Sequence, residues 1–175
     1  MSIDTIFNSQ LVSTVYGQLK SKYLRIWNNY IANPPSDAVT EVWPRVYVGN
    51  LQSALSRSVI EELGITHIVT AVIGVDMSFQ ASVEYLYVPL LDNQSQSIAD
   101  VFKVSNVFIK EALQDPNARV LVHCMVGASR SATLVAAYIM SETGFNSAHV
   151  LDIIKQKRPI INPNPYFREQ LQNKE

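Results

Sequence analysis

Residues 118–140 read ARVLVHCMVGASRSATLVAAYIM, and this stretch decides the fold. It begins as a β-strand, because residues 120–122 form a short apolar run that contains β-branched side chains. It ends as a buried helix, since residues 132–140 are nearly all apolar and good helix formers. A loop, residues 124–130, joins the two. The first N–H groups of a helix have no partner within it, so this strand–loop–helix unit predicts an anion site in the loop.

Two side chains suit this anion site to a phosphoryl group. Cys124 stands where the strand ends, and Arg130 follows six residues later at the start of the helix. Such surroundings lower the pKa of a thiol from ~8.5 to roughly 3.5–7.5, so we expect Cys124 to be a thiolate. The guanidinium of Arg130 is a planar fork that matches two phosphate oxygens, and Gly127 lets the loop fold around an anion. The chemistry that fits is attack of the thiolate on phosphorus, which gives a phosphocysteine that water then hydrolyses. The alternative is a buried structural cysteine, which is the usual state of a lone cysteine.

The loop resembles the signature of an enzyme family. Residues 123–131 read HCMVGASRS and match the H-C-x-x-G-x-S-R-S loop of dual-specificity protein phosphatases, which belong to the cysteine-dependent protein tyrosine phosphatase superfamily. Every fixed position is present, in the strand–loop–helix context that the motif requires. Residues 43–50 resemble the start of the phosphatase domain in the same family. The resemblance covers about residues 40–173. Because only an N-terminal segment flanks that region, the chain looks like the small, atypical members of the family.

The order of predicted elements indicates an α/β fold. Runs rich in β-branched and aromatic residues predict strands at 46–48, 67–72, 84–90 and 120–122. Apolar periodicity and capping residues predict helices at 52–63, 98–114, 132–140, 146–157 and 166–172. This alternation predicts a mostly parallel central sheet flanked by helices on both faces, which is the cysteine phosphatase fold that the resemblance implies.

The chain divides into three parts. We expect an N-terminal helical extension at 1–33, a linker rich in Pro, Ser and Asp at 34–41, and the catalytic domain at 42–175. Within the extension, apolar side chains recur every three or four positions over residues 4–32 and predict one long helix. Its apolar stripe needs a partner, and three alternatives stay open. The helix packs on the catalytic domain, forms a homodimer with a second copy, or binds a membrane surface.

Composition limits the partners and the location. The chain has 175 residues and a formal net charge of −1, which argues against nucleic acid as the main partner, because nucleic-acid-binding proteins usually carry a basic excess. It has one cysteine and no visible secretory signal, so we expect a cytoplasmic protein, with the nucleus as the alternative. No apolar run reaches the roughly 18 residues that a transmembrane helix needs, so no transmembrane segment is expected.

The resemblance implies roles for the catalytic side chains. Cys124 is expected as the nucleophile, and Arg130 with the loop N–H groups is expected to hold the phosphoryl oxygens. Asp92 follows the preceding strand, where the family carries its general acid, and its alternative is an ordinary turn aspartate. Ser131 is expected to donate a hydrogen bond to the Cys124 sulfur, although a serine at a helix N-terminus is also common for structural reasons.

Other side chains are expected to bind substrate or to support the loop. The expected substrate-binding residues are Met125, Val126, Gly127, Ala128, Ser129, Arg130 and Arg158. For Arg158 the alternative is charge pairing at a helix end. Strand alternation points the side chain of His123 away from that of Cys124, so we expect His123 to order the loop. No cluster with metal-ligand spacing is visible, and neither a metal nor a cofactor is expected.

The segment 158–164 resembles the family region that buttresses the phosphate loop. The pair Pro165-Tyr166 departs from the small, often glycine-containing pair that the family carries there.

The function that these features predict is hydrolysis of phosphotyrosine and phosphoserine or phosphothreonine in phosphorylated proteins. The connection 73–83 is too short to deepen the pocket, which agrees with the shallow cleft of the family's dual-specificity members. One alternative is a phosphatase of phosphoinositide or RNA 5′ phosphate. Such relatives often carry basic residues in the loop, whereas Met125, Val126 and Ala128 are uncharged. The other alternative is a non-catalytic phospho-binding module, which predicts loss of Cys124, Arg130 or Asp92.

Overall fold

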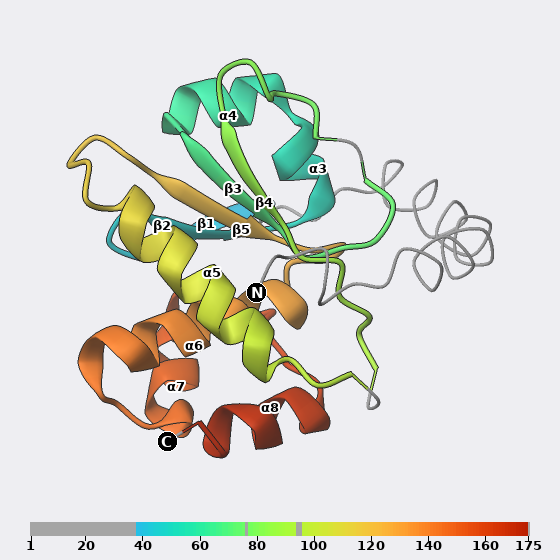
Figure 1. Cartoon of the computed structure of the whole chain (residues 1–175), viewed down its shortest axis with the longest axis vertical. Coiled ribbons are helices and arrows are strands. Elements are labelled where there is room, and N and C mark those ends of the chain that lie inside the picture. The colour runs from blue at the N-terminus through green and yellow to red at the C-terminus, as the bar shows by residue number, and fades with distance from the viewer. Residues whose placement is uncertain (1–37, 76, 94–95, 175) are drawn as a thin grey trace. The chain divides into compact units, whose positions relative to one another are not determined.

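The structure, a computed structural model, describes residues 38–75, 77–93 and 96–174. These residues form a five-stranded sheet with helices on both faces (Figure 1). The strands are β1 (Val39–Trp43), β2 (Val46–Gly49), β3 (His67–Thr70), β4 (Glu84–Tyr87) and β5 (Val120–His123). Their order across the sheet is β1-β2-β5-β3-β4. All neighbours run parallel except β1, which is antiparallel to β2, so the predicted α/β fold with a mostly parallel sheet is confirmed.

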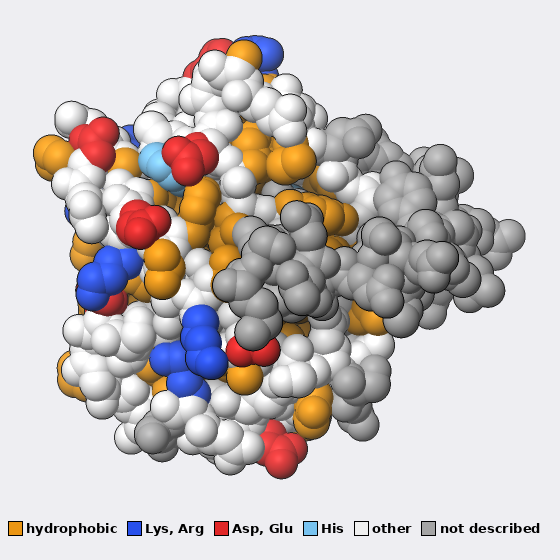
Figure 2. All heavy atoms as spheres, in the orientation of Figure 1, with side chains coloured by type: hydrophobic (Ala, Val, Ile, Leu, Met, Phe, Trp, Pro, Cys, Tyr) orange, Lys and Arg blue, Asp and Glu red, His pale blue; other side chains and the backbone are white. Residues whose placement is uncertain are grey.

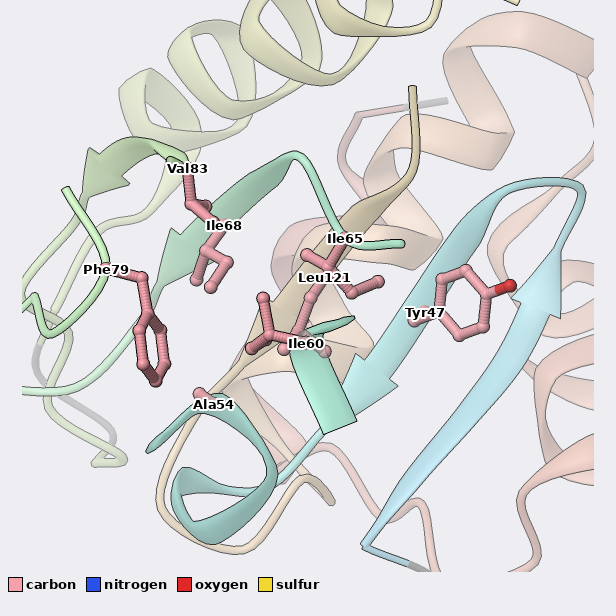
Figure 3. Packing of buried hydrophobic residues seen from close by; sticks show 8 residues of the cluster. All are labelled: Tyr47, Ala54, Ile60, Ile65, Ile68, Phe79, Val83 and Leu121. Atoms are coloured by element: carbon pink, nitrogen blue, oxygen red, sulfur yellow. The ribbon is translucent and has the colours of Figure 1, made fainter. Parts of the chain in front are cut away.

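The helices cover the sheet in two layers. They are α3 (Leu51–Leu55), α4 (Arg57–Leu63), α5 (Ala99–Ala112), α6 (Arg130–Thr143), α7 (Ser147–Lys157) and α8 (Pro165–Gln172). Helices α3 and α4 lie on one face, and α5 to α8 lie on the other (Figure 1). On the first face, side chains from α3, α4, the strands and the loops beside them form a buried apolar cluster (Figure 3): Tyr47, Ala54, Ile60, Ile65, Ile68, Phe79, Val83 and Leu121.

Helix α6 occupies the centre of the second layer. Every residue from Arg130 to Met140 is buried, because α6 packs against β5 and β2 and also against α5, α7 and α8. The buried apolar helix predicted for residues 132–140 is therefore present. The elements predicted at 98–114, 146–157 and 166–172 are also helices, with Asn146 as the N-cap of α7.

Two local predictions differ from the structure. The single helix expected at 52–63 is two helices, α3 and α4, because Ser56 adopts an extended backbone and its side chain accepts a hydrogen bond from the N–H of Val59. Gly64 ends α4 in the left-handed conformation, as its position predicts. Strand β1 begins at Val39, inside the stretch 34–41 that we expect to be a linker, so the sheet starts earlier than predicted.

Parts of the prediction lie outside the described residues. The helix expected over residues 4–32, and with it the homodimer and the other roles considered for it, stays a prediction. Within the described residues, no helix is long and apolar enough to cross a membrane. Figure 2 shows both acidic and basic side chains on the face in view, as the net charge of −1 leads one to expect.

Candidate active site

Cys124 lies at the junction between strand β5 and the loop that leads into helix α6. It follows the last residue of β5 and precedes the loop that leads into α6, and its side chain is 1% exposed. The Gly127 N–H donates a hydrogen bond to the sulfur over 3.3 Å, and the Ser131 hydroxyl oxygen lies 3.3 Å from the same sulfur. The loop and the first turn of α6 therefore direct polar hydrogens at Cys124 Sγ.

These surroundings set the charge of the thiol. Burial is the largest single influence and raises the pKa of Cys124, because it disfavours the charged thiolate. The positive charge of Arg130 and the hydrogen bonds from Ser131 and Gly127 lower that pKa, and together they outweigh burial. The net shift of the thiol pKa is downward, which favours the thiolate form that a nucleophile needs.

Arg130 is the first residue of α6, and its side chain lies under the surface with only 4% of the residue exposed. One terminal nitrogen, Nη1, donates to the carbonyl oxygen of Leu90 over 3.1 Å, which fixes the guanidinium beside the segment that follows β4. Its Nε is buried and has no hydrogen-bond partner among the described residues. A buried unpaired donor costs about 1–3 kcal/mol, so an anion that accepts from Nε would be stabilised here.

Asp92 lies against the phosphate loop, although 32 residues separate it from Cys124 in the sequence. Its Oδ1 accepts from the Ser129 hydroxyl over 2.8 Å and from the Asn164 side-chain amide over 2.7 Å. Its Oδ2 lies 3.7 Å from Arg130 Nε, and its side chain is 32% exposed. The structure thus brings a carboxylate, a guanidinium and a buried thiol to one loop.

Ser129 and Asn164 hold Asp92, which the sequence analysis did not anticipate. We expected Ser129 to bind substrate, and Asn164 was considered only as part of the segment 158–164, which resembles the family region beside the loop. The sequence does show Asn164 as a helix-capping residue before Pro165. Its contact with a side chain 72 positions away has no signal in one sequence.

Arg158 is not at the open side of the loop, so the expected contact with substrate is wrong. The residue is 1% exposed, and its Nε donates to the Gly127 carbonyl over 2.9 Å. Its Nη1 donates to the Thr40 hydroxyl on β1, also over 2.9 Å. Arg158 therefore lies beneath the loop and joins it to the edge strand, because the loop's carbonyl and the part-buried hydroxyl of Thr40 offer the acceptors that its guanidinium needs once buried.

The remaining loop residues differ in exposure. Val126 is 41% exposed, whereas Met125 is buried and its carbonyl accepts from the N–H of Leu51 at the start of α3. The carbonyl of Ala128 accepts from the N–H of Asn162, so the segment after α7 lies alongside the loop. Of the expected substrate-binding side chains at the variable positions, Val126 is thus the one that faces solvent most.

His123 is buried on the sheet, and its Nε2 lies 3.0 Å from the hydroxyl of Thr70 on β3. Burial and, to a smaller extent, the charge of Arg130 lower the pKa of His123 to about 4, against a hydrogen bond with the backbone at Cys124 that raises it. The imidazole is therefore neutral at pH 7. Within the described residues, no three His, Cys, Asp or Glu side chains converge on a point that would hold a metal ion.

Comparison with known proteins places this site in a family. The family described as "Dual specificity phosphatase, catalytic domain" matches residues 46–175. The chain belongs to the dual specificity phosphatase family. It is 34% identical over 131 residues to human dual specificity protein phosphatase 4, an alignment that covers 75% of this chain and 33% of that protein.

Two further relatives extend the comparison. The MAP kinase phosphatase with leucine-rich repeats protein 3 of Dictyostelium discoideum is 35% identical over 133 residues, which are 75% of this chain and 15% of that protein. The crystal structure of DUSP15 superposes with a TM-score of 0.73 at 37% identity, covering 77% of this chain and 85% of that one. This chain spans a third or less of the length of the two sequence relatives.

The crystal structure of the human tyrosine phosphatase-like serine/threonine/tyrosine-interacting protein also has this fold. It superposes with a TM-score of 0.72 at 33% identity and covers 77% of this chain and 93% of that one.

The first prediction concerns the loop that carries Gly127. A Cβ at Gly127 would lie 2.7 Å from Arg158 Nη2 and from the Gly49 carbonyl oxygen, and the residue has a φ of +73°. Gly144 has a φ of +71° but open space around it. Gly144→Ala should cost only the backbone strain, about 1–2 kcal/mol of unfolding free energy. Gly127→Ala should cost more and should weaken phosphate binding by about tenfold or more, because the loop must move.

Urea unfolding measures the stability, and protection of Cys124 from iodoacetamide by inorganic phosphate measures the binding. If Gly127→Ala and Gly144→Ala weaken phosphate binding equally, the close packing of Gly127 against Arg158 and Gly49 does not shape the loop.

The second prediction concerns the thiol. Ser131→Ala removes a hydrogen bond that favours the thiolate, so it should raise the pKa of Cys124. Because the chain has one cysteine, the rate of iodoacetamide alkylation against pH reports this group alone. Ser141→Ala, which alters a hydroxyl bonded to the Tyr138 carbonyl further along α6, is the control. An unchanged alkylation profile in Ser131→Ala would show that the hydroxyl does not stabilise the thiolate.

The third prediction concerns His123. Its folded-state pKa of about 4 lies below the usual 6.5, so between these values the unfolded state binds more protons. Stability is therefore lost as the pH falls below about 6.5, and this residue should remove about 2 kcal/mol of unfolding free energy by pH 5. In His123→Asn, the fall in unfolding free energy between pH 7.5 and pH 5 should be smaller by about that amount. Equal falls in both proteins would contradict a neutral buried imidazole.

Proposed function

We propose that this chain is an active protein phosphatase that hydrolyses phosphotyrosine and phosphoserine or phosphothreonine through a phosphocysteine intermediate. The observation that carries the proposal is the meeting of three groups at one loop. The thiol of Cys124 is buried with a lowered pKa, Arg130 Nε is a buried donor without a hydrogen bond among the described residues, and the carboxylate of Asp92 forms an ion pair with that nitrogen at 3.7 Å. A nucleophile, an oxyanion clamp and a proton donor are the groups that phosphoryl transfer to sulfur needs.

The first step uses all three groups. The thiolate of Cys124 attacks phosphorus and forms the S–P bond, while the P–O bond to the leaving oxygen breaks and its electron pair stays on that oxygen. Asp92 in its acid form gives its proton to this oxygen, which matters most for the alkoxide of phosphoserine or phosphothreonine. Arg130 and the loop N–H groups hold the three phosphoryl oxygens, on which the transition-state charge is spread.

The second step reverses the roles. A water attacks the phosphorus of phosphocysteine, and the Asp92 carboxylate takes up its proton. The S–P bond breaks and its electron pair returns to sulfur as the thiolate. The Ser131 hydroxyl, 3.3 Å from that sulfur, is placed to stabilise the thiolate as it leaves. Inorganic phosphate is the product, and the enzyme returns to its starting state.

The relatives and the loop both support a phosphorylated protein as the substrate. The relatives named above carry the words protein phosphatase or phosphatase in their names, which supports a phosphorylated protein as the substrate. The loop side chain most open to solvent is that of Val126, which is uncharged. An uncharged loop surface argues against a phosphoinositide substrate, whose head group is densely charged. We also propose a reducing compartment, the cytoplasm or the nucleus, because the reaction needs the one thiol of the chain in reduced form.

A non-catalytic phospho-binding role is the competing proposal. One protein with the same fold is named a tyrosine phosphatase-like interacting protein, a name that does not state catalysis. What favours catalysis in this chain is that Cys124, Arg130 and Asp92 are all present and gathered at the loop.

The fourth prediction tests catalysis. The wild-type protein should hydrolyse p-nitrophenyl phosphate and phenyl phosphate, and Cys124→Ser should hydrolyse neither. Asp92→Asn should lose about 10²–10⁴-fold in kcat/KM on phenyl phosphate, whose leaving oxygen needs a proton. It should lose much less on p-nitrophenyl phosphate, whose leaving group is stable as an anion. Phosphotyrosine and phosphothreonine peptides then establish the range of substrates.

Two results would overturn the proposal. A wild-type protein that binds phosphopeptides and hydrolyses none of these substrates would be a binding module. Equal losses in Asp92→Asn on both aryl phosphates would remove Asp92 as the general acid and leave the acid unidentified.

A further inference from the structure

Helix α8 contacts the segment that carries Asp92 at two separate places. We propose that Asn164 and Gln170, both at α8, are positioning residues that aim the Asp92 carboxyl at the leaving oxygen. This inference rests on the proposed function, because it concerns the general acid of that reaction. Neither residue touches the reacting atoms, and both act through hydrogen bonds to residues 91–98.

Asn164 holds Asp92 in a fixed orientation because its own amide is fixed. It is the N-cap of α8, and its Oδ1 accepts from the N–H of Phe167 over 2.9 Å. With the oxygen bound to the helix, the amide nitrogen points away from it and donates to Asp92 Oδ1 over 2.7 Å. The backbone N–H of Asn164 donates to the Ser129 hydroxyl, which in turn donates to the same Asp92 oxygen.

The hydrogen bonds from Asn164 and Ser129 determine which oxygen of the Asp92 carboxyl carries the catalytic proton. Asp92 Oδ1 accepts two hydrogen bonds, so in the acid form the proton belongs on Oδ2. That oxygen is the one that lies 3.7 Å from Arg130 Nε, on the side of the carboxyl that faces the phosphate clamp. The cap of α8 therefore turns the acid toward the place where the leaving oxygen would be.

Gln170 holds the other end of the segment. Its Oε1 accepts from the N–H of Ile98 over 2.7 Å, and its Nε2 donates to the Gln96 carbonyl over 3.1 Å. The side chain of Gln96 in turn accepts from the N–H of Leu91, the residue before Asp92, over 2.8 Å. A chain of hydrogen bonds thus runs from the middle of α8 to the backbone next to the general acid.

Helix α8 is a rigid support for these contacts. Phe167 and Leu171 are fully buried, and α8 packs against α6 and α7. Arg130 is the first residue of α6, and Asp92 is held by α8. The same packed pair of helices, α6 and α8, therefore positions both the guanidinium and the acid. A site held by packed helices is positioned more closely than one that depends on a loop alone.

The fifth prediction uses the leaving group as the readout. Gln170→Met keeps the size of the side chain but removes both hydrogen bonds, and Asn164→Ser keeps a capping oxygen but removes the amide donor without adding a charge beside Asp92. In each variant, kcat/KM should fall by about tenfold on phenyl phosphate, part of the 10²–10⁴-fold that a positioned acid supplies. The fall on p-nitrophenyl phosphate should be severalfold smaller. Gln172→Met, on the exposed side of the same helix, is the matched control and should lose on neither substrate.

The outcomes separate this inference from the proposed function. If wild type turns over neither substrate, the proposed function fails and the inference fails with it. If wild type is active and Gln170→Met loses equally on both substrates, or on neither, the proposed function stands and the positioning role is wrong. Thermal unfolding checks that each variant is folded, and where Asn164→Ser is not, Gln170→Met alone decides.

Discussion

The structure depends on placing one negative charge where burial opposes it. Cys124 is 1% exposed, and burial by itself raises the pKa of its thiol. A thiolate at that position needs compensation from groups fixed in advance, because water is not there to supply it. The compensation comes from the guanidinium of Arg130, the hydroxyl of Ser131 and the N–H of Gly127, all provided by one loop and the first turn of one helix. The same groups then suit a phosphate, whose oxygens need the same donors.

The rest of the domain holds that loop from several sides. Below it, Arg158 joins the Gly127 carbonyl to Thr40 on β1, and beside it the N–H of Asn162 donates to the Ala128 carbonyl. The Cys124 N–H donates to the carbonyl of Gly49 at the end of β2. These partners come from an edge strand, an inner strand and the segment after α7, so the sheet and the helices around it act as the scaffold of a single anion site.

The local parts of this arrangement could be read from the sequence, and the distant parts could not. The run from β5 through the loop to α6 is contiguous, and its composition alone indicates a strand, an anion loop and a buried helix. Gly64 and Asn146 mark helix ends by chemistry that acts within a few residues. Strand β1 was missed because Pro, Ser and Asp next to Val39 outweigh its β-branched residues. The place of Arg158 was misjudged because a charged side chain after a helix usually faces water, and only the fold shows that it reaches Gly127.

The central claim is that Cys124 carries the phosphoryl group during turnover. It is tested most directly by mixing the Asp92→Asn variant with an aryl phosphate, quenching with denaturant in alkali within the first turnover, since the phosphorus–sulfur bond survives there, and analysing the peptides by mass spectrometry. A phosphocysteine mechanism predicts a phosphate adduct on the peptide with Cys124, which forms as the phenol is released and is lost on longer incubation. Release of the phenol in a full first turnover without any adduct on Cys124 would contradict it, because phosphate would then pass directly to water.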